Sequence, residues 1–266
     1  MEEEFFDKLQ NMSEKFPERF NILEEQIDVK LQLRYFNFSK RVKKQANKNN
    51  EEFILEDQPD IFSKDISMED KKTILVKLAS IDDTKAFRII EDYSKKPDTE
   101  LHHWALLALQ ESRMLIESSL LDENQVFIST GLGGRGNMLR YFIVLVGDNI
   151  EEYQEFQQKM VKSEFDFALK KNNSELEIIE FKGRYALLTA LIPFKIQLQS
   201  VFRSAIEECN QYGGFLKSNF LVTNVKKLSI DEIKDIVENN KMPNIDEFKE
   251  SENTDYQNID DNDDEE

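Results

Sequence analysis

The residues best suited to chemistry lie in a glycine-rich stretch near the middle of the chain. Four of the eight glycines fall within six residues, in Gly131-Leu132-Gly133-Gly134-Arg135-Gly136, and Arg140 follows. Backbone amides in such a loop, helped by two guanidinium groups, can contact a phosphate or the backbone of a partner. Glycines also permit positive φ, so a tight connector without a ligand is the alternative. The candidate anion-binding residues here are Gly131, Gly133, Gly134, Arg135, Gly136 and Arg140.

The glycine spacing matches G-x-G-x-x-G, but the surrounding sequence does not match known phosphate loops. In a dinucleotide-binding fold the loop precedes a helix, whose N-terminus holds the pyrophosphate. Here an apolar run typical of a strand, Leu139 to Val146, follows instead. A kinase glycine loop does lie between strands, yet the chain has no V-A-I-K, H-R-D or D-F-G motif in usable context. A connector and a partner-contacting loop therefore both remain open.

A second candidate site is the basic segment that ends the first predicted helical region. Lys40, Arg41, Lys43 and Lys44 fall within five residues, and Lys48 follows. Cations are favoured near the C-terminus of a helix, so one interpretation is a solvated helix end. The other interpretation is a contact with an anionic partner.

The other reactive side chains favour structural roles. His102 and His103 are the only histidines, and adjacent helical residues point about 100° apart, so the two cannot share a metal as an i, i+4 pair does. Cys209 lies on the apolar stripe of a predicted helix, which is typical of a buried small hydrophobe. No carboxylate pair stands out as an acid–base couple. The sequence therefore predicts no enzyme, no metal and no cofactor, and an active site assembled from distant residues stays an open alternative.

The N-terminal part that positions the basic segment is predicted to be helical. Residues 1–50 favour one or two helices, with an apolar stripe at Phe20, Leu23, Ile27, Leu31 and Tyr35. After a connecting loop over 51–65, three shorter helices begin at Ser67, at Asp82-Asp83 and at Asp98, whose side chains can cap them. These short helices, joined by aspartate turns and Pro97, resemble HEAT or armadillo repeats between Ser67 and Ser119. That resemblance implies a protein-binding surface, and an irregular helical bundle is equally consistent.

From Gln125 the periodicity changes to alternating strands and helices. A short strand over 126–129 precedes the glycine loop, and the order β-α-β-β-α-β follows, with a tight turn at Lys182-Gly183. This order is typical of a ferredoxin-like domain, a four-stranded antiparallel sheet with two helices on one face. RNA recognition motifs share this topology, but Arg184 and Ala186 stand where their stacking aromatics belong. The fold supports many functions and does not choose among them.

Composition and charge limit the compartment and the partners. The single cysteine fits a reducing compartment, and the acidic N-terminus lacks the features of a signal peptide. The net charge is −18, of which residues 244–266 carry −10 and the remainder −8. An acidic body is a poor electrostatic match for a polyanion in general, although a local basic patch can still bind one. We expect a soluble cytoplasmic protein with no membrane partner and no DNA partner.

The sequence thus predicts an α+β chain in three parts. These are a helical domain over 1–122 (HEAT-like or an irregular bundle), a ferredoxin-like domain over 123–240 and a disordered acidic tail over 241–266. The predicted function is a non-enzymatic binding or adaptor protein, associated with ribosomes or other RNA machinery through a protein or ribonucleoprotein partner. The alternative is a regulatory protein that binds a small molecule at the ferredoxin-like domain. The sequence does not indicate the oligomeric state.

Overall fold

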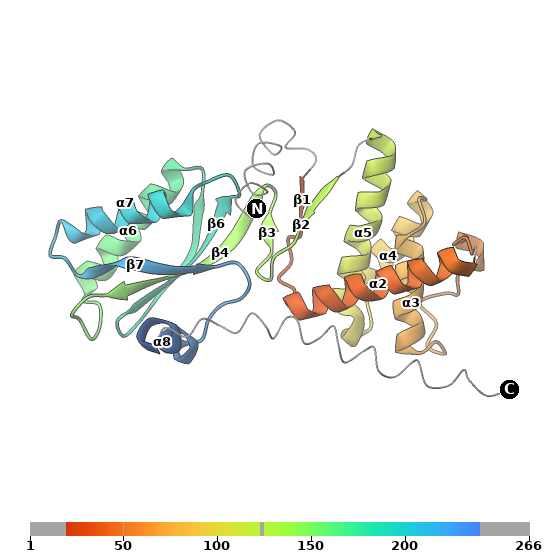
Figure 1. The fold of residues 1–266 in the computed structure, drawn as a ribbon, viewed down its shortest axis with the longest axis horizontal. Coiled ribbons are helices and arrows are strands. Elements are labelled where there is room, and N and C mark those ends of the chain that lie inside the picture. The colour runs from red at the N-terminus through yellow and green to blue at the C-terminus, as the bar shows by residue number, and fades with distance from the viewer. Residues whose placement is uncertain (1–19, 50, 123–124, 240–266) are drawn as a thin grey trace. The chain divides into compact units, whose positions relative to one another are not determined.

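The protein is a mixed α and β chain. A computed structural model describes residues 20–49, 51–122 and 125–239, and these contain seven α-helices and two β-sheets (Figure 1). The chain divides into two units, residues 1–225 and residues 226–266. The predictions for a helix within residues 1–19 and for the acidic tail over 241–266 lie outside the described residues. The predicted domain boundaries at 122 and 240 stay predictions.

The helical part consists of four α-helices and two short 3-10 turns. In chain order they are α2 (Val29–Asn49), η2 (Leu55–Asp57), α3 (Met68–Ala79), α4 (Thr84–Lys95), η3 (Thr99–Leu101) and α5 (His102–Leu121). The predicted cap of α3 is confirmed, because the Asp70 amide donates to the Ser67 hydroxyl at 3.1 Å. Asp83 caps α4 in the same way, through the Lys85 amide at 2.7 Å. The fully buried side chains at the centre of this part include Tyr35, Leu75, Ile90 and Leu107.

The helix predicted from Phe20 onward is wrong at its start. Residues Phe20–Ile22 form a strand, β1, which pairs in parallel with β2 (Val126–Ile128) in a separate two-stranded sheet. α2 begins only at Val29, where the Asp28 carboxylate accepts hydrogen bonds from the amides of Lys30 at 2.9 Å and Leu31 at 3.2 Å. Ladder pairing with a segment about a hundred residues away overrides the local helical periodicity, and the N-cap at Asp28 fixes where the helix starts.

The five-stranded sheet begins within the glycine loop. Its strands are β3 (Gly134–Arg135), β4 (Met138–Gly147), β5 (Glu175–Lys182), β6 (Tyr185–Pro193) and β7 (Leu216–Thr223). They lie in the order β3-β4-β6-β5, β7 also pairs with β4, and every pair is antiparallel. Gly183, at φ +57°, provides the left-handed residue in the turn from β5 to β6.

Two helices cover one face of this sheet. They are α6 (Glu155–Lys171) and α7 (Leu198–Asn210) (Figure 1). Alternate residues of β4, such as Ile143 and Leu145, pack with Phe165 of α6 and Phe202 of α7 in one buried cluster. The two phenyl rings stack with their centroids 6.0 Å apart. A period-two apolar pattern on the strands and a helical stripe on each helix thus meet in a common core.

The second unit contributes one described helix, α8 (Ile230–Asn239). It begins with the predicted capping box, because the Glu232 amide donates to the Ser229 hydroxyl at 3.3 Å and the Ser229 amide donates to the Glu232 carboxylate at 2.8 Å. In the part of the chain that the structure describes, no helix is both long and apolar enough to cross a membrane.

Asp98, predicted to cap the third helix, joins three elements instead. It makes no side-chain capping bond to η3. Its carboxylate accepts hydrogen bonds from Lys71 Nζ at 2.6 Å and from the Tyr93 hydroxyl at 2.6 Å. Lys71 is buried, so its ammonium group depends on this one carboxylate for compensation. The hydrogen bond from Lys71 is the main cause that lowers the pKa of Asp98 below its ordinary 3.8.

We expect Asp98→Asn and Lys71→Ala each to lower the free energy of unfolding by about 2 kcal/mol at pH 7. The value is below that of a fully buried pair because the Asp98 side chain is 32% exposed. Because the pKa of Asp98 is lower in the folded state, its carboxylate stabilises the fold at any pH above the ordinary pKa of an aspartate. This stabilisation is lost as the pH falls through the folded-state pKa. The difference between wild type and Asp98→Asn in urea denaturation should therefore shrink below pH 3.8.

Lys95→Ala is the matched control for this prediction, because it removes an exposed ion pair to Asp92 on the same helical hairpin. It should change the free energy of unfolding little. Equal losses for Lys95→Ala and Lys71→Ala would show that the Lys71–Asp98 pair contributes no more than a surface pair.

Candidate functional site

The glycine loop uses most of its backbone amides within the chain. Leu132 N–H donates to the Asn224 carbonyl at 3.0 Å, and Gly134 N–H donates to the Glu24 carbonyl at 3.2 Å. Gly136 N–H donates to the Glu24 carboxylate at 3.0 Å. These are the groups that an anion-binding loop would point at its ligand. In this chain they bind the segment after β1 and the end of β7.

Close backbone approach explains two of the glycines. A Cβ on Gly131 would lie 1.7 Å from the Val225 carbonyl oxygen. A Cβ on Gly133 would lie 2.3 Å from the Glu24 carbonyl oxygen, and Gly133 also has φ +67°. A side chain at either position would force the backbone apart. The glycine pattern therefore fits a crossing point of three chain segments, the connector interpretation that the sequence left open.

The two arginines of the loop region are both paired with glutamates of β5. Arg135 forms an ion pair with Glu175. Arg140 binds Glu177 through Nε at 2.7 Å and Nη2 at 3.0 Å, and donates through Nη1 to the Leu132 carbonyl at 2.9 Å. The hydrogen bond to Glu177 raises the pKa of Arg140. Because each charge already has a partner, the geometry favours the connector, and anion binding by this loop stays a prediction.

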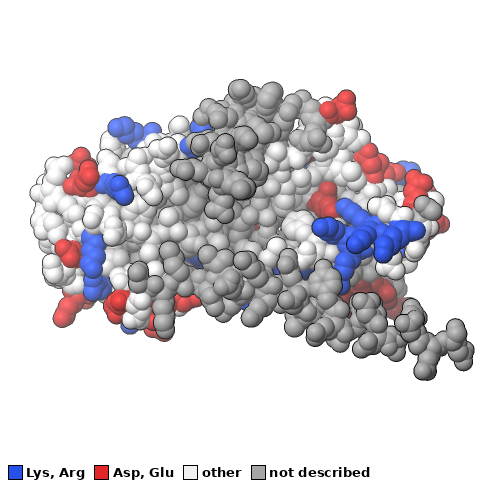
Figure 2. Space-filling model, in the orientation of Figure 1, with Lys and Arg blue, Asp and Glu red and all other residues white. Residues whose placement is uncertain are grey.

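The basic segment forms a distinct surface on the C-terminal half of α2. Lys40, Lys44 and Lys48 are exposed and recur at i, i+4 and i+8, so they lie in one row along the helix. Among residues 20–49, 51–122 and 125–239, no carboxylate lies within ion-pair distance of these three lysines. Figure 2 shows Lys and Arg side chains gathered over this part of α2. We call the row Lys40, Lys44 and Lys48 the α2 basic surface.

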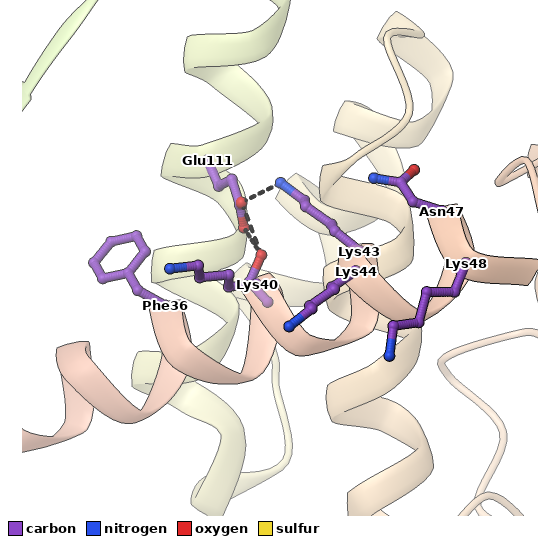
Figure 3. Close-up of a pocket in the computed structure, with 8 residues that line it drawn as sticks. Phe36, Lys40, Lys43, Lys44, Asn47, Lys48 and Glu111 are labelled. Carbon is purple, nitrogen blue, oxygen red and sulfur yellow. Dashed lines mark hydrogen bonds and ion pairs between the residues drawn. The ribbon is translucent and has the colours of Figure 1, made fainter. Parts of the chain in front are cut away.

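A shallow hollow lies beside the α2 basic surface. Its walls are the lysine side chains together with Phe36, Ser39, Asn47 and Glu111 (Figure 3). Lys43 points toward Glu111, while Lys44 and Lys48 point away from it. Arg41 is exposed and lies over the Phe38 ring, 5.7 Å from its centroid. The four predicted basic residues thus divide, because Lys43 is bound to Glu111 of α5, whereas Lys40, Arg41 and Lys44 are exposed.

Glu111 of α5 holds the inward face of α2 through three donors. The Tyr35 hydroxyl, the Ser39 hydroxyl at 2.9 Å and Lys43 Nζ at 2.6 Å all donate to its carboxylate. These donors recur at i, i+4 and i+8, like the exposed lysines, but on another side of the helix. Tyr35 is fully buried, and its burial, followed by the nearby Glu111 charge, raises its pKa. The phenol is therefore a neutral donor at physiological pH.

Glu111, Tyr35 and Ser39 are site residues that the sequence did not predict. A signal was present, since Tyr35, Ser39 and Lys43 are polar-headed residues at helical spacing, and Glu111 interrupts the apolar stripe of α5. Their convergence depends on how α2 and α5 pack, which spacing within one helix does not reveal. The basic segment and the glycine loop, the two predicted sites, are also separate from each other. Gln32 at the start of α2 donates to the Thr130 carbonyl, just ahead of the glycine loop. Lys44 lies about 18 Å further along the same helix.

The two histidines and the cysteine do not belong to the α2 basic surface. His102 and His103 lie beside each other with ring centroids 5.2 Å apart. Burial raises the pKa of the Cys209 thiol to about 12, so the thiol is protonated at neutral pH. Within the described residues, no group of three or more His, Cys, Asp or Glu side chains is placed to hold a metal ion.

We expect Gly131→Ala to lower the free energy of unfolding by about 3 kcal/mol, because the new methyl group would overlap the Val225 carbonyl oxygen. Gly136→Asn is the control, since a Cβ there meets no atom within 4 Å and asparagine tolerates φ +58°. Its cost should be about 1 kcal/mol or less. Denaturant unfolding measures both. Similar values for the two variants would mean that the loop is not tightly enclosed.

A scan against protein-family models finds no match to this chain, and a search of the curated proteins finds none either. Function therefore has to be inferred from the residues themselves. Of the two candidate regions, the α2 basic surface has lysines without a carboxylate partner among the residues that the structure describes, whereas both arginines near the glycine loop are paired.

Proposed function

We propose that the chain is a non-enzymatic binding protein of the cytoplasm that holds an RNA-containing partner on the α2 basic surface. The observation that carries the proposal is the row of exposed lysines without carboxylate partners among the described residues. Other described lysines, such as Lys85 and Lys217, also have no ion pair, but Lys40, Lys44 and Lys48 lie in one row and concentrate positive potential on one strip of surface.

A set of hydrogen bonds to α5 holds α2 in place beside this row, which suits a binding surface. Glu111 holds α2 from an adjacent side of the helix through Tyr35, Ser39 and Lys43. A preorganised helix loses less conformational entropy on binding than a loop does. Burial raises the pKa of Tyr35 and of Cys209, so both groups are protonated at neutral pH.

We also propose the finer fold assignment on which the adaptor model depends. The strand order β7-β4-β6-β5, antiparallel throughout and covered on one face by α6 and α7, supports a ferredoxin-like domain. The hairpin α3–α4 followed by α5 supports either a HEAT-like arrangement or an irregular bundle. In both cases α2 supplies the basic surface.

The proposal predicts nuclease-sensitive capture of an RNA-containing complex from native cell extract at low salt. The triple variant Lys40→Gln, Lys44→Gln, Lys48→Gln should lower that capture by about tenfold or more, because it removes three cationic contacts to phosphate. Arg135→Ala should leave the capture unchanged if the loop is a connector. Quantifying bound RNA before and after nuclease treatment measures both effects.

The control for charge is the triple variant Lys85→Gln, Lys96→Gln, Lys217→Gln, which removes three exposed lysines from α4, its C-terminus and β7. It changes the net charge equally without touching α2. If the intact protein neither cosediments with ribosomes nor binds RNA at low salt, the proposed function is wrong. Capture that survives nuclease would indicate a purely protein partner.

A further inference from the structure

We infer that the α2 basic surface takes a single RNA strand through successive phosphates of its backbone, without reading its sequence. The inference rests on the proposed function and adds the form of the ligand. Lys40, Lys44 and Lys48 follow one another at four-residue intervals, which places them about 6 Å apart along the helix axis. Adjacent phosphates along one nucleic-acid strand have a comparable separation, so three ammonium groups can meet three neighbouring phosphates.

The shape of the surface favours one strand over a duplex. The charges form a single row on one helix, whereas a duplex presents two phosphate backbones on either side of a groove. The lysine that would widen the row toward α5, Lys43, is already bound to Glu111 at 2.6 Å. Glu111 also places a carboxylate at the edge of the hollow, where a second phosphate chain would meet negative charge.

The hollow beside the row favours a nucleic acid over an acidic peptide. Phe36 and the aliphatic stems of Lys40 and Lys44 line it, and Asn47 stands at its wall (Figure 3). A base or sugar next to a bound phosphate can lie against such an apolar wall. A glutamate side chain has only two methylene groups for contact with the same wall, much less apolar surface than a base.

The choice of lysine explains why we expect binding that does not depend on the RNA sequence. An ammonium group is a mobile point charge that binds a phosphate without fixed geometry, unlike the planar fork of arginine. Arg41 is turned over the Phe38 ring and does not join the row. Affinity should therefore come mainly from released counterions and depend steeply on salt.

The test is fluorescence anisotropy of the full chain with a labelled single-stranded oligouridylate between 50 and 200 mM salt. Three phosphate contacts predict that log K falls with log salt at a slope of about −2, so affinity should drop about 20-fold over this range. Lys44→Gln should make the slope shallower by about 0.7, and the Lys40, Lys44, Lys48 triple should nearly abolish it. The control triple at Lys85, Lys96 and Lys217 should leave the slope unchanged.

The variant Glu111→Gln tests the inference in the opposite direction, because it should strengthen RNA binding. The amide oxygen still accepts from Tyr35 and Ser39, but it no longer neutralises Lys43. We expect tighter RNA binding and a slope steeper by up to about 0.7, as one more cation becomes available. Circular dichroism confirms that the variant is folded, and Lys44→Gln, at an exposed position, tests the inference even where Glu111→Gln does not fold.

Three outcomes would overturn the inference. They are equal slopes for the α2 triple and wild type, tighter binding to duplex RNA of the same sequence, and equal competition by polyglutamate of matched charge. If any of these is observed while nuclease-sensitive capture still depends on α2, the single-strand inference is wrong and the proposed function is still supported. Loss of both RNA binding and capture would remove both.

Discussion

The carboxylate of Glu111 is the contact on which the α2 basic surface depends. It accepts from Tyr35, Ser39 and Lys43, so one side of α2 is bound to α5 along two turns of helix. Hydrogen bonds to a charged acceptor are stronger than neutral ones, and at a partly buried carboxylate they are harder to replace by water. With this side fixed, the lysines at 40, 44 and 48 have a defined direction relative to the helical core.

The lysines at the C-terminal end of α2 therefore have two different roles, one within the fold and one at its surface. Lys43 is a basic residue by sequence, yet its charge is used to compensate Glu111, whereas Lys44, one position further on, has no such partner among the described residues. The glycine loop shows the opposite outcome, since Arg135 and Arg140 are both compensated by β5. The number of cations in a segment thus says little about binding, because a cation that is paired with a nearby carboxylate is less available to a ligand.

What the sequence could predict was set by the range of the interactions. The order of strands and helices after Gln125, the cap at Ser67 and the capping box at Ser229 depend on neighbours within a few residues, and they were predictable. β1 pairs with β2 about a hundred residues away, so a helical stripe that began at Phe20 gave the wrong element. Asp98 looked like a cap, but a lysine 27 positions earlier binds its carboxylate. Glu111 was missed for the same reason.

The glycine loop illustrates how one pattern serves two chemistries. Glycines bring backbone amides close to an acceptor, and the acceptor can be a phosphate or a peptide carbonyl. Here Glu24 and Asn224 supply carbonyls from segments on either side of the loop in sequence, and the sheet begins at Gly134, whose amide donates to the Glu24 carbonyl. A ligand phosphate would have to displace these acceptors and break Arg140 away from Glu177. Within the described residues, Lys40, Lys44 and Lys48 have no carboxylate to give up, and this difference in competing interactions supports the α2 basic surface as the proposed binding surface.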